Sequence, residues 1–231
     1  MRSYINFFLL PLLLFQIQIA LGQEIYVTGN VDDVVANLGG RIRTNPFNYV
    51  YDGSPYLKDE FLYGEILYNH EWRFTNIPVR YNILFDEIEY KRPDKETIYS
   101  LSADTLFDMI YIPEDTFVVS LYEKEMKITP GFFKLITPGS AALLIKMEVE
   151  FREATSETTH EMAMDARFVN NPDQYFVKKA GQPAEYVKNI KKLINHLGNH
   201  EEELTTFSKE HKLSSKKEKD LKQIIDYYNS F

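Results

Sequence analysis

The stretch that decides the fold class is Ile145-Lys146-Met147-Glu148-Val149-Glu150-Phe151-Arg152. Each apolar residue in it is followed by a charged one. In an extended chain successive side chains point to opposite faces, so one face of this strand is apolar and the other is charged. A strand with one face in water is typical of an antiparallel sheet. The stretch therefore predicts that Lys146, Glu148, Glu150 and Arg152 are exposed.

Similar alternation recurs from Phe61 to about Phe176, most clearly in residues 78–82 and 87–91 and more weakly near 98, 109–112 and 117–122. Two Thr-Pro-Gly sequences, at 129–131 and 137–139, have the residue order of a type II turn with glycine at positive φ. Residues 132–136 between them are long enough for one short strand. We therefore predict an antiparallel β-rich body over residues 23–183, built as a meander and shaped as an open barrel or a sandwich-like sheet. Residues 24–28 are a candidate first strand, and the rest of residues 23–57 is left unassigned.

Residues 184–231 are predicted to form a helical tail, packed on the body as a cap of three short helices. Gly198 can close the first helix, while Asn199 with Glu202 and Ser215 with Glu218 have capping-box spacing for the next two. We expect the apolar stripes to be buried, because isolated helices this short are marginal; the alternative is an arm that docks a partner. The stripe residues are Val187, Ile190, Leu193, Ile194, Leu197, Leu204, Phe207, Leu221, Ile224, Ile225 and Tyr228. The fold class is thus α+β, an antiparallel body followed by a C-terminal helical cap.

The first 22 residues have the pattern of an export signal. Arg2 precedes an apolar run from Phe7 to Ile19, and Ala20-Leu21-Gly22 supplies small residues before Gln23. The run is too short to span a bilayer comfortably, so we expect a cleaved signal peptide rather than an anchor. No later stretch has the apolar length of a transmembrane helix, and the expected location is periplasmic or at the cell surface.

Composition narrows the possible functions. The chain of 231 residues has no cysteine, which excludes disulfides, thiolate catalysis and thiolate metal sites. Its net charge of −8 argues against nucleic-acid binding, which requires a basic face. The 44% hydrophobic residues are sufficient for a sizeable core. We expect no cofactor.

Three segments carry a resemblance. The segments GSPYL (53–57), VRYNILFDEIEY (79–90) and EKDLKQIIDYYNS (218–230), with Phe61 and Gly64, resemble a group of uncharacterised exported proteins from bacteria of the Bacteroidota type. The resemblance covers most of the mature chain and implies a periplasmic or surface setting, a β-rich body and a helical tail. It implies no activity, because none is established for that group.

Few residues have the spacing of a catalytic or metal site. His196 and His200 stand four apart, as zinc ligands on one helical face do, but Gly198 between them predicts a helix break and exposed histidines. The carboxylate pairs, such as Glu148 and Glu150, fit a solvated strand face with cross-strand ion pairs better than a glycosidase site. Gly39-Gly40-Arg41 lacks the order of a phosphate-binding loop and is expected to be a turn. No GxSxG nucleophile motif is present.

Tyrosines form the only candidate binding surface, at Tyr49, Tyr51, Tyr56 and Tyr63. Tyrosine clusters occur on faces that bind glycans or proteins, because the ring offers contact area and a polar tip. They also occur on half-buried antiparallel sheets, and the structural interpretation is the one we favour. The function we expect is a non-enzymatic binding or assembly module of the bacterial cell envelope, with an envelope protein or a glycan as partner. The alternatives are a periplasmic hydrolase with dispersed acidic residues and a carrier of a small apolar ligand.

Overall fold

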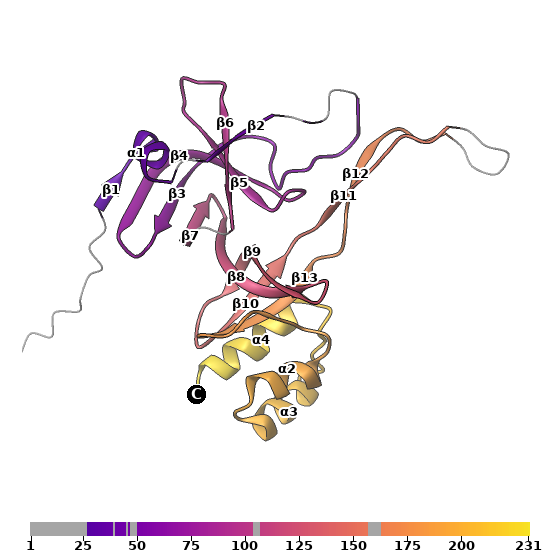
Figure 1. The fold of residues 1–231 in the computed structure, drawn as a ribbon. Helices are drawn as coiled ribbons and strands as arrows, with labels where there is room; N and C mark the ends of the chain where they lie inside the picture. Colours follow the sequence, from indigo (N-terminus) through magenta and orange to yellow (C-terminus); the bar gives the residue numbers. More distant parts are fainter. Residues whose placement is uncertain (1–26, 39, 45, 47–49, 104–106, 157–162) are drawn as a thin grey trace, which may run out of the picture.

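The structure is a computed structural model that describes residues 27–38, 40–44, 46, 50–103, 107–156 and 163–231 (Figure 1). It confirms an α+β fold with a strand-rich antiparallel body and three C-terminal helices. The elements are, in chain order, β1 (Val27–Gly29), α1 (Val31–Asn37), β2 (Arg41–Arg43), β3 (Leu62–Tyr68), β4 (Trp72–Asn82), β5 (Glu87–Lys91), β6 (Ile98–Ser102), β7 (Phe107–Ile112), β8 (Asp115–Lys124), β9 (Lys127–Thr137), β10 (Ala141–Lys146), β11 (Val149–Arg152), β12 (Arg167–Asn170), β13 (Gln174–Lys179), β14 (Glu185–Tyr186), α2 (Ile190–Leu197), α3 (Glu201–Glu210) and α4 (Glu218–Asn229).

Among the described residues, 12 strands join in one sheet with the order β14-β13-β10-β9-β8-β7-β3-β4-β5-β6-β2, with β1 paired to β4 in parallel. Two meanders make up most of this order, β3–β6 and β7–β10. They meet where β7 returns to pair with β3. The predicted meander is therefore present, and it is one of two.

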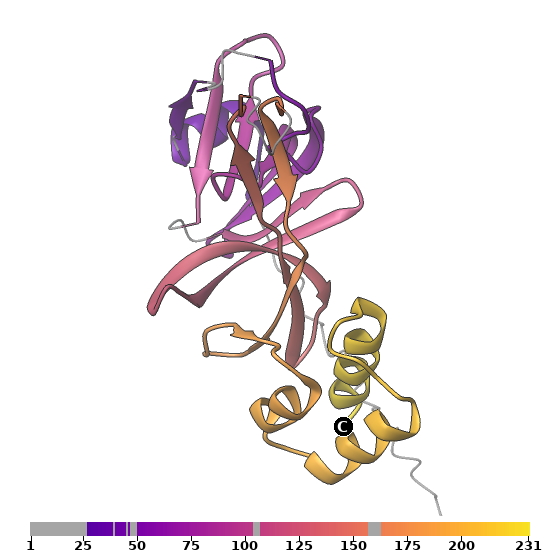
Figure 2. The same ribbon diagram turned by 90° about the vertical axis from the view of Figure 1, so that its right-hand side faces the viewer.

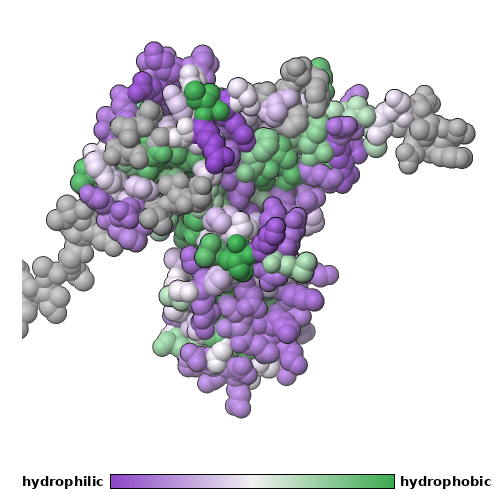
Figure 3. Space-filling view, viewed as in Figure 1, coloured by the Kyte–Doolittle hydropathy of each residue, from purple (hydrophilic) through white to green (hydrophobic). Residues whose placement is uncertain are grey.

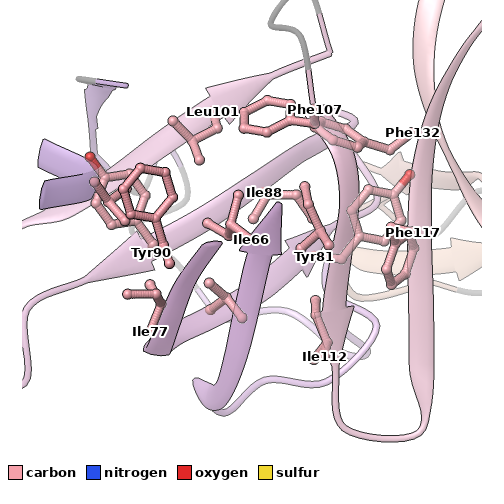
Figure 4. Packing of buried hydrophobic residues seen from close by; sticks show 14 of the residues in the cluster. Ile66, Ile77, Tyr81, Ile88, Tyr90, Leu101, Phe107, Ile112, Phe117 and Phe132 are labelled. Atoms are coloured by element: carbon pink, nitrogen blue, oxygen red, sulfur yellow. The ribbon is translucent and has the colours of Figure 1, made fainter. Parts of the chain in front are cut away.

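The first meander encloses the larger core. Alternate residues of β3, β4 and β5 point inward, among them Ile66, Ile77 and Ile88, each with no exposed surface. Tyr81 of β4 lies against Phe117 of β8, with ring centroids 4.8 Å apart (Figure 4). This contact joins the core of the first meander to the start of the second.

The second meander curls back on itself. The amide of Ala184 donates a hydrogen bond of 2.7 Å to the carbonyl of Leu121, so the end of the sheet near β13 returns to β8. The rings of Tyr122, Phe133 and Phe176 meet edge to face inside this curl, with centroids 5.1 to 5.7 Å apart. A single β-bridge between Tyr122 and Ala184 therefore holds this part of the sheet in a curl.

The three C-terminal helices cover the outer face of β10 and β13. Leu143 of β10 and Val177 of β13 have no exposed surface and pack against the helices. The helices gather at the end of the molecule opposite β1–β6 (Figure 2), and on the face drawn in Figure 3 their outer surface is mainly hydrophilic. The buried residues of the cap are Val187, Leu193, Ile194, Leu197, Leu204, Leu221, Ile224, Ile225 and Tyr228, whereas Ile190 and Phe207 are partly buried.

Residues 145–152, whose alternation predicted a single strand, belong to two strands. β10 ends at Lys146, and Val149–Arg152 forms β11, which pairs with β12 in a separate two-stranded sheet. This pair projects as an arm beside the first meander (Figure 1). The prediction that Lys146 is exposed is wrong: the residue is 3% exposed, because its ammonium group meets a carboxylate inside the protein.

Two other local predictions are wrong. Thr129–Gly131 lies within β9 rather than in a turn, and Gly131 does not have a positive φ; the β8–β9 turn is made by Glu125 and Met126, with φ of 51° and 62°. Gly139 does have a positive φ, 144°, as predicted.

The helix caps also differ from those predicted. Asn199 and Ser215 are not the N-caps, which are His200 and Lys217, and neither of these has a side-chain capping bond. The side chain of Asn189 caps α2 instead, by accepting from the amide of Lys192 at 2.9 Å. Gly198 ends α2 in the left-handed conformation, as predicted.

Candidate functional site

An open groove of about 550 Å³ crosses the outer face of β3, the β7–β8 turn and the start of β8. Two tyrosines stand in it with much of their surface in solvent, Tyr63 at 58% and Tyr111 at 38% exposed. The described residues that line it are Tyr63, Gly64, Glu65, Leu67, Arg73, Tyr111, Ile112, Pro113, Glu114, Asp115 and Thr116.

The sequence builds the groove through strand alternation and one glycine. Tyr111 lies between the buried Ile110 and Ile112 of β7, so its side chain points outward. Gly64 lets β3 approach β7 closely, because a Cβ at this position would lie 2.2 Å from the carbonyl oxygen of Tyr111. A β-bulge follows directly, between Gly64 and Ile66 in the pairing of β3 with β4. Bulges commonly redirect side chains in this way.

Each carboxylate that lines the groove is paired with a cation. Glu65 Oε2 accepts from Arg73 at 2.6 Å and 2.9 Å. Glu114 lies 3.0 Å from the ammonium group of Lys58, and the buried Asp115 lies 2.5 Å from that of Lys134. The two more exposed pairs, Glu65 with Arg73 and Glu114 with Lys58, add little to stability. They do make the lining polar while leaving little net charge in it.

Of the predicted tyrosine surface, Tyr63 lines this groove. Tyr49 lies outside the described residues. Tyr51 packs edge to face on Phe168 of β12 at 5.0 Å, and Tyr56 is covered by the guanidinium of Arg80 at 3.6 Å. The interpretation as packed residues therefore describes Tyr51 and Tyr56, and the interpretation as a binding surface fits the environment of Tyr63.

Tyr111, Arg73 and Glu65 were missed by sequence reasoning. The alternation in residues 109–112 already placed Tyr111 opposite the apolar face of its strand. What the sequence does not contain is the pairing of β3 with β7, which sets Tyr111 directly across from Glu65. A search for clustered tyrosines in the sequence could not find a pair whose members lie on strands so far apart in the chain.

A second, smaller pocket of about 230 Å³ surrounds a polar network. The fully buried Glu89 accepts from Arg80 at 2.8 Å and from Asn82 at 2.8 Å. The guanidinium of Arg80 also lies 4.3 Å from the ring of Phe61 and donates to the carbonyl of Asp59. Burial, and after it the charge of Glu89, raises the pKa of Tyr56. These groups satisfy one another and hold residues 56–61 against β4, so this pocket is a structural feature.

The histidines do not come together at a metal site. His196 Nδ1 lies 2.5 Å from Glu185 Oε2, whereas the ring of His200 stacks on that of Phe231 at 3.9 Å. Within the described part of the chain, no group of three or more histidine, aspartate or glutamate side chains has the geometry for a metal ion.

The two remaining sequence candidates have separate contacts. Glu148 accepts from Gln174 at 2.9 Å, while Glu150 pairs with Arg152 at 3.3 Å. Gly40 has a φ of 134°, as a turn residue can.

None of the described helices combines the length and apolarity needed to cross a membrane. Comparisons of the chain with protein-family models, with curated proteins and with solved structures find no match.

Proposed function

We propose that this chain is a non-enzymatic binding module of the bacterial cell envelope, and that the groove across β3, β7 and β8 holds a neutral saccharide. The observation that carries the proposal is the pairing of two exposed tyrosine rings with a polar lining that has little net charge.

The chemistry of the groove favours a saccharide over an ionic ligand. A sugar has apolar C–H faces that pack on aromatic rings and hydroxyl groups that bond to polar side chains, and tyrosine offers both kinds of contact. The cations Arg73 and Lys58 are occupied by Glu65 and Glu114, so an acidic ligand would have to displace these partners. The groove is also built on paired strands, which hold their side chains in fixed positions and so reduce the entropy lost on binding.

The envelope setting rests on the first 22 residues, which lie outside the described part. Their basic start, short apolar run and small residues before Gln23 support export. A cysteine-free chain is compatible with an oxidising compartment, because it carries no thiol that could mispair there.

The test is a glycan array probed with the mature chain, containing neutral and acidic oligosaccharides, followed by calorimetric titration of the best hit. We expect neutral oligosaccharides to bind and Tyr63→Ala and Tyr111→Ala each to weaken binding by about tenfold or more, which corresponds to about 1.4 kcal/mol. Tyr186→Ala is the matched control, because Tyr186 is 52% exposed but lies on β14, outside the groove. An array without neutral hits, or equal affinities for all three variants, would contradict the proposal.

A further inference from the structure

Outside the groove, a buried lysine, Lys146, lies in contact with a largely buried aspartate, Asp86. Lys146 Nζ of β10 lies 2.5 Å from Asp86 Oδ2 of the β4–β5 turn. The side chain of Lys146 is 4% exposed and that of Asp86 is 26% exposed. The two residues are far apart in the chain, and their contact ties the first meander to the curled second meander.

Surrounding groups fix both partners in position. Lys146 Nζ also donates to the carbonyl oxygen of Phe132 at 2.9 Å, and it lies 5.2 Å from the centre of the Phe133 ring. Asp86 Oδ1 accepts from the hydroxyl of Tyr81 at 2.7 Å and from the amide of Phe132 at 3.3 Å. Oδ1 therefore faces two donors, while Oδ2 faces the amine and also lies 3.4 Å from the shared amide of Phe132.

Gly131 makes room for this arrangement. A Cβ at this position would lie 3.0 Å from Asp86 Oδ2 and 3.0 Å from Lys146 Nζ, and 2.8 Å from the ring of Tyr122. The glycine lies inside β9 without a positive φ, so backbone conformation does not require it. The glycine is required instead because the Asp86 and Lys146 side chains approach it closely.

We propose that Lys146 and Asp86 form an intramolecular amide bond, which cross-links the β4–β5 turn to β10. The proton that moves from Nζ to Oδ2 across their contact gives a neutral amine and a carboxylic acid. Nζ then attacks Cγ, the negative charge that develops on Oδ1 is stabilised by Tyr81 and the Phe132 amide, and Oδ2 leaves as water with a second proton from Nζ. One N–C bond forms, one C–O bond breaks and one water is released, with no change of oxidation state.

Burial supports the first step of this reaction. It lowers the pKa of Lys146, although the neighbouring Asp86 acts in the opposite direction. A neutral amine is the nucleophilic form of lysine, and burial of this kind is one way in which proteins activate it. The partly exposed carboxylate of Asp86 leaves a path for the released water. In a chain without cysteine, such a bond would supply the covalent link that a disulfide otherwise provides.

The test is mass spectrometry of the folded wild-type chain. We expect an intact mass about 18 Da below the sequence mass, which is one water lost. Because an N-terminal glutamine also loses mass when it cyclises, the bond is located by tandem spectrometry of a peptide that joins the segments around residues 86 and 146. Lys134 and Asp115 are an internal control at the same distance of 2.5 Å; Lys134 is 31% exposed, and these two should stay unlinked.

Two variants separate the chemistry from the packing. Lys146→Arg keeps the charge but has no amine that can form this amide, so it should show the full sequence mass. Tyr81→Phe removes the donor to Oδ1, and we expect a mixture of linked and unlinked chains. The wild-type measurement alone decides the outcome if a variant fails to fold. A folded wild-type chain with full mass and separate peptides for residues 86 and 146 would overturn the proposal.

Discussion

Replacing Ile224 by alanine tests whether the C-terminal helices are an integral part of the fold. Ile224 of α4 has no exposed surface and belongs to the cluster that joins the helices to β10 and β13. Its truncation removes buried apolar contacts and leaves a cavity, for which we expect a loss of about 3 kcal/mol in the free energy of unfolding. In a chain of this size that loss corresponds to about 6–12 °C in melting temperature.

The control for this substitution is on the same helix. Asp226→Ala removes an exposed ion pair with Lys222, whose atoms are 2.9 Å apart, and should change the unfolding free energy by no more than about 0.5 kcal/mol. Both variants are measured by circular dichroism during heating, with the wild type alongside. If the helices were an arm for a partner, Ile224→Ala would leave the melting of the body unchanged. Equal melting temperatures for the two variants would therefore refute the interpretation of the C-terminal helices as an integral cap.

Three more predictions concern a helix residue, two glycines and a buried tyrosine. Asn229→Ala should lower the free energy of unfolding, measured by chemical denaturation, by about 1–3 kcal/mol. The Asn229 side chain accepts from the Ala141 amide at 3.0 Å and donates to the Ala141 carbonyl at 2.9 Å, and the substitution leaves that amide without this partner. An unchanged denaturation midpoint would contradict this prediction. Gly131→Ala should destabilise more than Gly181→Ala, because a Cβ at Gly131 meets three side chains within 3.0 Å. A Cβ at Gly181, with φ of 71°, meets nothing within 4 Å and costs only about 1 kcal/mol of backbone strain. Equal denaturation midpoints for the two variants would show that the space around Gly131 is not tight. Burial raises the pKa of Tyr122 from 10.0 to about 12, so the stability it contributes is complete below pH 10 and is lost as the pH rises toward 12; the melting temperature should fall over this range, and fall less in Tyr122→Phe.

Sequence periodicity predicted where several strands and helices lie, because apolar residues recur in them at strand or helix spacing. The alternation in residues 87–91 located β5, although Glu89 on the side predicted to be exposed is fully buried beside Arg80. The stripe from Leu221 to Tyr228 corresponds to the buried face of α4. Gly198 could be identified as a helix end because only the local backbone decides it. These are features in which a residue's own neighbours determine the result.

Features that depend on distant contacts could not be predicted. The alternating pattern places Lys146 on the solvent-exposed face of a strand. Its burial depends on contact with Asp86, and nothing in the sequence links the two residues. Thr129-Pro130-Gly131 has the residues of a turn, but pairing with β8 extends the strand through it, and close packing rather than φ accounts for Gly131. The groove has the same origin, since Tyr63 and Tyr111 line one groove only because β7 returns to β3.

The most direct test of the proposed function is a chemical-shift map of the isotopically labelled mature chain, titrated with the neutral oligosaccharide that binds best on the array. Tyr63, Gly64, Tyr111 and Thr116 line the groove, and their amide resonances are predicted to shift together and to saturate at one affinity. Shifts confined to other surfaces, such as β14 or the arm of β11 and β12, would contradict the proposal that this groove is the binding site.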